Sequence, residues 1–485
     1  MQSPGICESA ETSLVPEFPL VEELAPVPSL AEALRAFADW PDVILFDSAL
    51  PRPSLGRYSF LAADPVEFVQ VSRPGMGVDP FEQLTLRMKE WTTPAIPDLP
   101  PFQGGAAGLL SYELGGSWER IAPARVNEFE FPALAVGLYD WVLAWDHLQS
   151  RAWIISQGLP ELDPDRRRRR AAERLAAVRQ QLTNPSTRDS TKLTRSQRDR
   201  TIPLPENRHA IPGAPHLTSN FSRDGYLSAV ARAIEYIRAG DIFQVNLSQR
   251  LALPCSRNPV EYYLDLRRCN PAPFAGFFAH DDWAVASSSP ERFVSLKRQA
   301  VETRPIKGTR QRRGAPEADL YTRDELRESE KDQAENVMIV DLLRNDLSRV
   351  CEAGSIRVPD LCRVESYETV QHLVSVVQGR LRSGLTAFDL FTAAFPGGSI
   401  TGAPKVRAME IIAELEPTVR GPYCGSLFYV GCDGTLDSSI LIRTVCLRRG
   451  WGVFPVGGGV VAQSDPADEY DETLHKATGM LRTFT

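Results

Sequence analysis

The sequence lacks the features that would place it in or across a membrane. It has no apolar run approaching the roughly 18 residues that a membrane helix needs, and residues 1–18 have neither an apolar core nor a basic start. We therefore expect no signal or transit peptide and a cytoplasmic protein. The eight cysteines stand singly without a Cys-x-x-Cys pair, which favours reduced thiols in or near the core over disulfides.

The chain also lacks a surplus of positive charge, since 54 Lys and Arg residues face 62 Asp and Glu residues, a formal net charge of −8. A nucleic-acid partner is not expected, because a protein that binds phosphates along a strand needs a basic face. A small anionic substrate remains compatible with this charge, because a few well-placed donors are enough to bind it.

The patterns that are present predict an α+β protein of three segments. Residues 1–157 show strands, among them 43–46 and 138–145, mixed with short helices. Residues 158–218 form a basic and polar connector that we expect to be partly disordered, with five arginines at 166–170 and a helix to about residue 182. Residues 219–485 interleave strands and helices without a strict βαβ rhythm, which favours an α+β fold.

A predicted helix over residues 324–350 carries acids on a stripe of core aliphatic residues. A buried carboxylate such as Glu335 or Asp346 needs a cation or hydrogen bonds. The simpler alternative is a carboxylate at the rim of the core, paired with an arginine such as Arg344.

The last helix, which Ser464 or Asp465 can cap, places Glu469, Glu472 and Lys476 on one face. A surface ion pair between Glu472 and Lys476 is the simpler interpretation. Because Mg²⁺ takes only one or two protein carboxylates and leaves its other positions to water and substrate, Glu335 and Glu472 together are also a candidate magnesium site.

Two glycine-rich segments are predicted as loops. Residues 396–405 lead into a helix, and Gly457, Gly458 and Gly459 follow a predicted strand over 451–456. Exposed N–H groups in such loops suit a carboxylate, although tight turns explain the glycines equally well. Neither segment has the phosphate-binding or dinucleotide-binding pattern, so nucleotide binding is excluded.

Lys307 lies among arginines, prolines and glycines in residues 304–310. Such a lysine is usually a surface residue. To act as a nucleophile it must be uncharged, which requires burial or nearby cations to lower its pKa from about 10.4 towards neutrality.

Taken together, these segments resemble the chorismate-binding enzyme family, which includes anthranilate synthase component I, aminodeoxychorismate synthase component I and the isochorismate and salicylate synthases. The motifs occur in the family's order: Ser-Pro-Glu-Arg-Phe at 289–293, Pro-Ile-Lys-Gly-Thr at 305–309, residues 335–347, Gln-His-Leu-Val-Ser at 371–375, residues 396–405 and residues 471–477. The resemblance implies the anthranilate synthase component I-like fold, in which antiparallel β-sheets pack as a sandwich with helices on the outside.

The resemblance also implies roles for individual residues. Glu335 and Glu472 match Mg²⁺ ligands, Glu291 matches the acid that helps the C4 hydroxyl of chorismate to leave, and His372 matches a histidine of the catalytic site. Residues that match substrate-binding positions are Gly308, Thr309, Tyr423, Arg443, Gly457, Gly458, Gly459 and Lys476. In the first segment, Ser48 together with Pro273, Phe274 and Ala275 resembles a tryptophan site, but Phe46-Asp47-Ser48 replaces the family's Leu-Glu-Ser.

Two positions favour the aminodeoxychorismate synthase branch. Anthranilate synthases carry Ala where Lys307 stands, and isochorismate and salicylate synthases carry a water-activating Lys where Gln244 stands. Lys307 is then the expected nucleophile, in a reaction of chorismate with ammonia that gives 4-amino-4-deoxychorismate for 4-aminobenzoate and folate synthesis. The alternatives are an anthranilate synthase component I and a non-catalytic, tryptophan-binding regulatory subunit.

The resemblance implies two protein partners. None of the cysteines lies on a glycine-flanked elbow of the kind a glutaminase needs, so a separate glutamine amidotransferase subunit, component II, would supply the ammonia. No motif of a pyridoxal-phosphate lyase is present, so a downstream aminodeoxychorismate lyase would act on the product.

Overall fold

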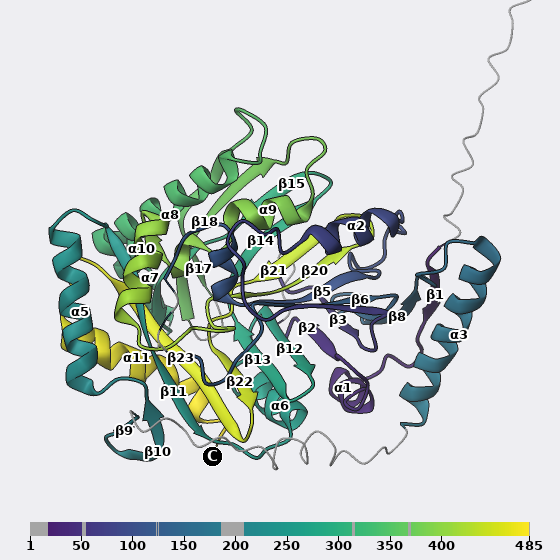
Figure 1. Cartoon of the computed structure of the whole chain (residues 1–485), viewed down its shortest axis with the longest axis horizontal. Helices are drawn as coiled ribbons and strands as arrows, with labels where there is room; N and C mark the ends of the chain where they lie inside the picture. The colour runs from purple at the N-terminus through teal and green to yellow at the C-terminus, as the bar shows by residue number, and fades with distance from the viewer. Residues whose placement is uncertain are drawn as a thin grey trace, which may run out of the picture.

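The computed structural model describes residues 18–50, 55–122, 124, 126–185, 208–312, 316–366 and 370–484. In these residues the strands form two large antiparallel sheets (Figure 1). The first sheet runs, in spatial order, β1 (Leu20–Glu23), β8 (Arg151–Ser156), β7 (Trp141–Asp146), β3 (Tyr58–Ala62), β2 (Ile44–Asp47), β12 (Phe274–His280), β13 (Trp283–Ser289), β22 (Thr444–Arg448), β23 (Trp451–Val460), β11 (Gln244–Pro254), β10 (Ala214–Ser219) and β9 (His209–Ile211), with β19 (Gly402–Ala403) paired to β11.

The second sheet packs face to face with the first. Its order is β16 (Ile306–Gln311), β18 (Val370–Arg380), β15 (Ala300–Thr303), β14 (Arg292–Lys297), β21 (Leu436–Ser439), β20 (Ser426–Gly431), β5 (Gly105–Leu110), β6 (Leu134–Tyr139) and β4 (Glu67–Val71), with β17 (Arg357–Ser366) paired to β18. One apolar cluster lies between the sheets and joins Ile44 and Phe278 of the first to Leu109 and Tyr139 of the second.

Helices cover the outer faces of both sheets and complete two further apolar clusters. They are α1 (Leu30–Ala36), α2 (Glu82–Glu90), α3 (Pro164–Thr183), α5 (Arg223–Arg238), α6 (Pro259–Cys269), α7 (Pro316–Glu328), α8 (Glu330–Ser348), α9 (Ala387–Ala394), α10 (Lys405–Leu415) and α11 (Pro466–Leu481), with 3-10 turns η1 (Tyr112–Ser117) and η2 (Gly398–Ile400). The predicted α+β sandwich with outer helices is confirmed. Among the described residues, no helix is both long and apolar enough to cross a membrane.

Strands from both sides of the predicted boundary at residue 157 share both sheets. Phe46 of β2 lies opposite Gly276 of β12, and Leu110 of β5 lies opposite Ser426 of β20. Within the predicted connector, α3 is an ordered helix, and its Arg170 and Arg174 reach the fully buried Asp140 at 3.4 and 3.2 Å. Residues 186–207 of that connector lie outside the described residues.

Three local predictions are wrong. The single strand expected over residues 138–145 is interrupted at Asp140, which lies between the end of β6 and the start of β7 and meets Arg170 and Arg174 of α3. The helix expected over 324–350 is divided between α7 and α8 at Ser329, whose hydroxyl caps α8. The glycines expected in a loop belong to β23, where Gly459 lies opposite Asn246 and Gly457 opposite Ser248 of β11.

A buried ion pair fixes the segment that follows α10. Arg420 and Glu416 are joined at 2.7 Å, and their side chains are only 2% and 4% exposed. The guanidinium also donates to the carbonyls of Ile400 and Asn246 at 3.1 and 2.7 Å. The pair therefore ties the glycine-rich loop before α10 to β11.

We expect Arg420→Met to lower the free energy of unfolding by about 3–5 kcal/mol, because it leaves the Glu416 carboxylate buried without its cation. Chemical denaturation measures this change. The matched control Arg407→Met, which breaks ion pairs at a 37% exposed side chain, is expected to cost less than about 1 kcal/mol. The double variant Arg420→Met/Glu416→Gln is expected to be more stable than the single one; equal stability would contradict the buried-charge explanation.

Candidate functional site

Several predicted site residues converge where β16, α8, α11 and the loop before α10 meet the ends of β11 and β23. Lys307 comes from β16, Glu335 from α8, Glu472 and Lys476 from α11, and Glu291 from the turn that precedes β14. We call this group the lysine–glutamate cluster. The sequence places these residues far apart, and the two sheets with their outer helices bring them together.

Lys307 is partly buried and lies in the middle of the cluster. Its Nζ donates to the carbonyl of Ser399 at 3.1 Å. Burial lowers the pKa of Lys307, while the negative charges of Glu335 and Glu291 act against this shift. The uncharged amine required of a nucleophile is thus favoured by burial.

A bulge in β16 sets the position of Lys307. The register with β18 shifts between Lys307 and Thr309, and Gly308 adopts a left-handed φ of 62°. A Cβ at Gly308 would also lie 2.8 Å from Leu326 Cδ1 and 3.0 Å from Asp332 Cγ. The predicted His372 is buried in β18 and lies opposite Thr309, of which only the backbone is described.

Glu291 is almost fully buried, at 5% exposure, and accepts a hydrogen bond from Ser399 Oγ at 2.7 Å. Burial raises the pKa of Glu291 to about 7, although Ser399 and Lys307 act in the opposite direction. A carboxyl group with a pKa near 7 is suited to donate a proton at neutral pH.

The two predicted metal-binding carboxylates face the same cluster. Burial raises the pKa of Glu335, and Lys307 acts against the rise; the amide of Gln244 approaches this carboxylate at 3.4 Å. Glu472 makes the predicted ion pair with Lys476 at 2.6 Å. Burial alone would raise the pKa of Glu472, but Lys476 holds it below its ordinary value.

The glycines of β23 allow this close packing. A Cβ on Gly458 would lie 3.0 Å from Glu469 Oε2 and 3.6 Å from both Glu472 Oε1 and Lys476 Nζ. A Cβ on Gly459 would lie 2.1 Å from Gln244 Nε2, a distance that no side chain tolerates. Lys476 Nζ donates to the carbonyl of Gly457 at 2.9 Å. The three glycines therefore bring α11 and Gln244 against β23.

Arg443 and Tyr423 lie next to the strand ends that carry Glu291. The segment around Arg443 is bonded to that of Glu291, because the amide of Ile440 donates to the carbonyl of Glu291 at 3.0 Å. Burial lowers the pKa of Arg443, and no charged group of the described residues acts against this shift. Tyr423 is buried and lies under the Arg420 guanidinium. A partly buried guanidinium that no carboxylate of the described residues compensates would be stabilised by an anionic ligand.

Asp346, the other acid singled out on α8, does not belong to the cluster. It pairs with Lys405 at 2.6 Å and lies 3.6 Å from Arg349, whereas Arg344 pairs with Asp341 at 2.7 Å, so Arg344 is not its arginine partner. The buried Lys405 is the first residue of α10 and also donates to the carbonyl of Ala394. Asp346 therefore anchors the glycine-rich loop.

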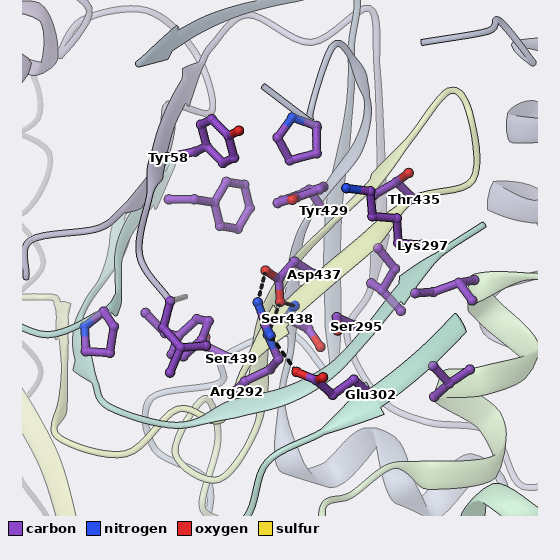
Figure 2. A pocket seen from close by; sticks show the side chains of 18 of the residues that line it. Tyr58, Arg292, Ser295, Lys297, Glu302, Tyr429, Thr435, Asp437, Ser438 and Ser439 are labelled. Atoms are coloured by element: carbon purple, nitrogen blue, oxygen red, sulfur yellow. Dashed lines mark hydrogen bonds and ion pairs between the residues drawn. The ribbon is translucent and has the colours of Figure 1, made fainter. Parts of the chain in front are cut away.

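The predicted tryptophan-site residues lie elsewhere, on the wall of a cavity of about 790 Å³ (Figure 2). Ser48, Pro273, Phe274 and Ala275 all line it. Figure 2 shows the Arg292 guanidinium held by Asp437 and Glu302, with Tyr58 and Tyr429 on the other side of the cavity. Lys307, Glu291, Glu335 and Glu472 are not among its lining residues.

Asp47, which stands where the related family has Glu, also lines this cavity, and its carboxylate already has hydrogen-bond partners within the protein. It accepts hydrogen bonds from Arg267 at 2.6 Å, from Tyr263 at 2.8 Å and from Ser59 at 3.2 Å. The hydroxyl of Ser48 donates to the carbonyl of Tyr58. The departure from the family pattern is thus compensated within the protein.

Sequence reasoning missed Ser399 as an individual residue, although it belongs to the glycine-rich motif. Its neighbours explain its fixed position: the carbonyl of Ser399 also accepts from Asn246 Nδ2 at 3.2 Å, and Gly398 packs against Leu342 so closely that a Cβ would lie 2.6 Å away. The sequence of a motif does not indicate which carboxylate its hydroxyl group will contact in the folded protein.

Comparison with known proteins adds independent information. The family described as "chorismate binding enzyme" matches residues 60–482. The chain is 44% identical over 382 residues to aminodeoxychorismate synthase component 1 of Klebsiella aerogenes, covering 79% of this chain and 77% of that protein. It is 39% identical over 387 residues to anthranilate synthase component 1 of Thermus thermophilus, covering 80% and 78%. The solved structure of anthranilate synthase component I from Streptococcus pneumoniae superposes with a TM-score of 0.72 at 30% identity, over 89% of this chain and 93% of that one.

Proposed function

Because this chain belongs to the chorismate-binding enzyme family, we propose that it is the chorismate-converting component of an aminodeoxychorismate synthase. It would convert chorismate and ammonia into 4-amino-4-deoxychorismate and water. The observation that carries this proposal is Lys307, a partly buried amine beside the buried Glu291 carboxyl group. The names of several relatives, among them those from Klebsiella aerogenes and Escherichia coli, support the same reaction.

In the proposed reaction the Lys307 amine attacks C2 of chorismate, both ring double bonds shift by one position, and the C4 hydroxyl leaves. Hydroxide is a poor leaving group, so Glu291 donates a proton and the group departs as water. Ammonia then bonds to C4, both double bonds shift back, the Lys307 amine leaves C2, and the new ammonium group returns a proton to Glu291. Two successive displacements place the nitrogen on the face that the hydroxyl left.

Glu335 and Glu472 would hold Mg²⁺, which when bound would neutralise a carboxylate of the substrate and fix the orientation of the ring. The described residues contain no ready-made cage of three or more His, Cys, Asp or Glu side chains. Two carboxylates next to Lys307 nevertheless suit Mg²⁺, because this ion takes water and substrate oxygens as its other ligands. Burial raises the pKa of Glu335, and the negative charge of Glu472 adds to this shift. A cation between the two side chains would therefore stabilise the ionised Glu335 carboxylate, which burial and Glu472 disfavour.

The remaining predicted residues would bind the substrate. Arg443 would supply a guanidinium for which no ion pair is found among the described residues, and Tyr423 lies next to Cys424, whose amide donates to the carbonyl of Leu441. Gly308 and Thr309 would contribute backbone groups next to Lys307, and His372 would act from the neighbouring strand β18. On the α11 side of the lysine–glutamate cluster, the substrate would contact Gly457–Gly459 and Lys476.

The ammonia would come from a partner. Several relatives are named as component 1, which implies at least one further component. Burial raises the pKa of six of the eight thiols, those of Cys255, Cys351, Cys362, Cys424, Cys432 and Cys446, which is the reverse of what a glutaminase nucleophile needs. We therefore propose a separate glutamine amidotransferase as component II and a separate lyase for the product. The cavity of Figure 2 would take the aromatic amino acid tryptophan.

Product analysis tests the function. Purified protein is incubated with chorismate, Mg²⁺ and ammonium chloride, and the products are separated by liquid chromatography. We expect 4-amino-4-deoxychorismate, which yields 4-aminobenzoate only after an aminodeoxychorismate lyase is added. Fluorescent anthranilate and pyruvate formed without a lyase would instead establish the second candidate, anthranilate synthase component I, which the 39% identical relative favours.

A further inference from the structure

Ser399 contacts both reactive side chains of the cluster. Its hydroxyl is bonded to Glu291 Oε1 at 2.7 Å, and its carbonyl accepts from Lys307 Nζ at 3.1 Å. Glu291 precedes β14 and Lys307 lies on β16 of the same sheet, and no hydrogen bond or ion pair within the described residues joins them directly. We propose that Ser399 is a positioning residue that fixes the proton donor and the nucleophile relative to each other.

The surroundings of Ser399 make it a rigid support. Asn246 Nδ2 donates to its carbonyl, Thr401 Oγ1 closes the turn onto the carbonyl of Gly397 at 3.0 Å, and Arg420 holds the next residue, Ile400. A Cβ on Gly397 would lie 2.7 Å from Ile440, so this loop is packed without spare room. The two contacts of Ser399 are therefore set by the fold rather than by a free rotation of the loop.

Each contact has a separate chemical consequence. The hydroxyl bonds one carboxyl oxygen, Oε1, which leaves Oε2 outside this hydrogen bond as the oxygen that can carry the transferable proton. The carbonyl takes one N–H of Lys307; an uncharged amine that donates one N–H still keeps its lone pair for attack on carbon. One residue thus orients an acid and a nucleophile that must act on the same substrate ring.

This inference rests on the proposed function and predicts a specific change in the pH dependence. The groups that face Glu291 are the Ser399 hydroxyl, the Lys307 amine, the amide of Ile306 and the Cys424 thiol. The Ser399 hydroxyl stabilises the ionised carboxylate, so its removal must raise the Glu291 pKa from its value of about 7. A hydrogen bond to a charged group makes the expected shift about one pH unit.

The experiment compares Ser399→Ala, Ser399→Thr and Thr401→Val in the full chain. In Ser399→Ala we expect kcat/KM to fall roughly 10- to 100-fold, and the ionisation near pH 7 in its pH profile to move to higher pH. Infrared difference spectra follow the same ionisation directly through the carbonyl stretch of the protonated carboxyl group, with Glu291→Gln identifying the band. Ser399→Thr keeps the hydroxyl and is expected to restore both values.

Thr401→Val is the matched control, because it removes a hydroxyl of the same loop that bonds only loop carbonyls. It is expected to leave the Glu291 ionisation in place. If the wild type forms 4-amino-4-deoxychorismate but the ionisation is unchanged in Ser399→Ala, Ser399 has no positioning role and the proposed function stands. If the wild type forms anthranilate, the proposed function itself fails.

Discussion

Lys307→Ala is expected to abolish formation of 4-amino-4-deoxychorismate, with kcat/KM reduced by roughly three orders of magnitude or more, and to leave the fold intact. The physical reason is that Lys476, the other lysine of the lysine–glutamate cluster, is committed to Glu472 and to the carbonyl of Gly457 and so does not replace the Lys307 amine. Alanine removes the nucleophile without introducing a charge or extra volume. Product formation by liquid chromatography and thermal unfolding measure the two parts of this prediction.

A covalent intermediate allows a more direct test of Lys307. With chorismate and Mg²⁺ but without ammonia, the mass of the intact wild-type protein is expected to increase by chorismate minus one water. Peptide mapping should locate this adduct on Lys307, and Lys307→Ala should lack it. Lys297→Ala is the matched control, because this exposed lysine lies at the end of β14 in the same sheet and lines the separate cavity. An active Lys307→Ala variant would refute the nucleophile role.

Glu335→Gln and Glu472→Gln are each expected to raise the Mg²⁺ concentration for half-maximal activity by roughly 100-fold or more, because each variant removes one of only two charged oxygen ligands. Magnesium titrations of the initial rate measure the change. Isothermal titration calorimetry with MgCl₂ in the presence of chorismate measures it independently of turnover.

Asp471→Asn provides the control for this second prediction. It removes a carboxylate from an exposed position adjacent to Glu472 on the same helix, and it is expected to leave the magnesium dependence unchanged. If Glu472→Gln behaves like Asp471→Asn, the Glu472–Lys476 contact is only the surface ion pair that helical spacing also predicts. That outcome would leave Glu335 without a second ligand and would reject the proposed magnesium site.

The sequence predicts this protein well where the information is local. Of the two residues expected to cap the last helix, Asp465 caps α11 through its side chain, because a cap depends on residues within one helical turn. The prediction of a β-sandwich comes from the resemblance to the chorismate-binding family and not from local sequence patterns. Prediction fails where a distant partner decides: β6 and β7 separate at Asp140 because Arg170 and Arg174 of α3 are there to receive it.

The candidate site shows the same division. The motifs identify Lys307, Glu291, Glu335 and Glu472 one at a time. These residues come together only through the packing of the two sheets and their outer helices. The sequence predicts that the glycines at 457–459 lie in a loop. In the structure their backbone pairs with β11, and their missing side chains make room for Gln244 and α11. Only coordinates reveal that the hydroxyl of Ser399 and its carbonyl serve different residues.

The interleaving of early and late strands has a consequence for how the chain is made on the ribosome. β5 is among the first strands of its sheet to be synthesised, yet one of its edges is completed only by β20, near the end of the chain. β2 likewise lacks its neighbour β12 until that later strand is synthesised. Until then these nascent strands expose unpaired backbone groups that attract other chains. We expect rapid translation to favour inclusion bodies and a chaperone that shields such edges to raise the yield of native enzyme.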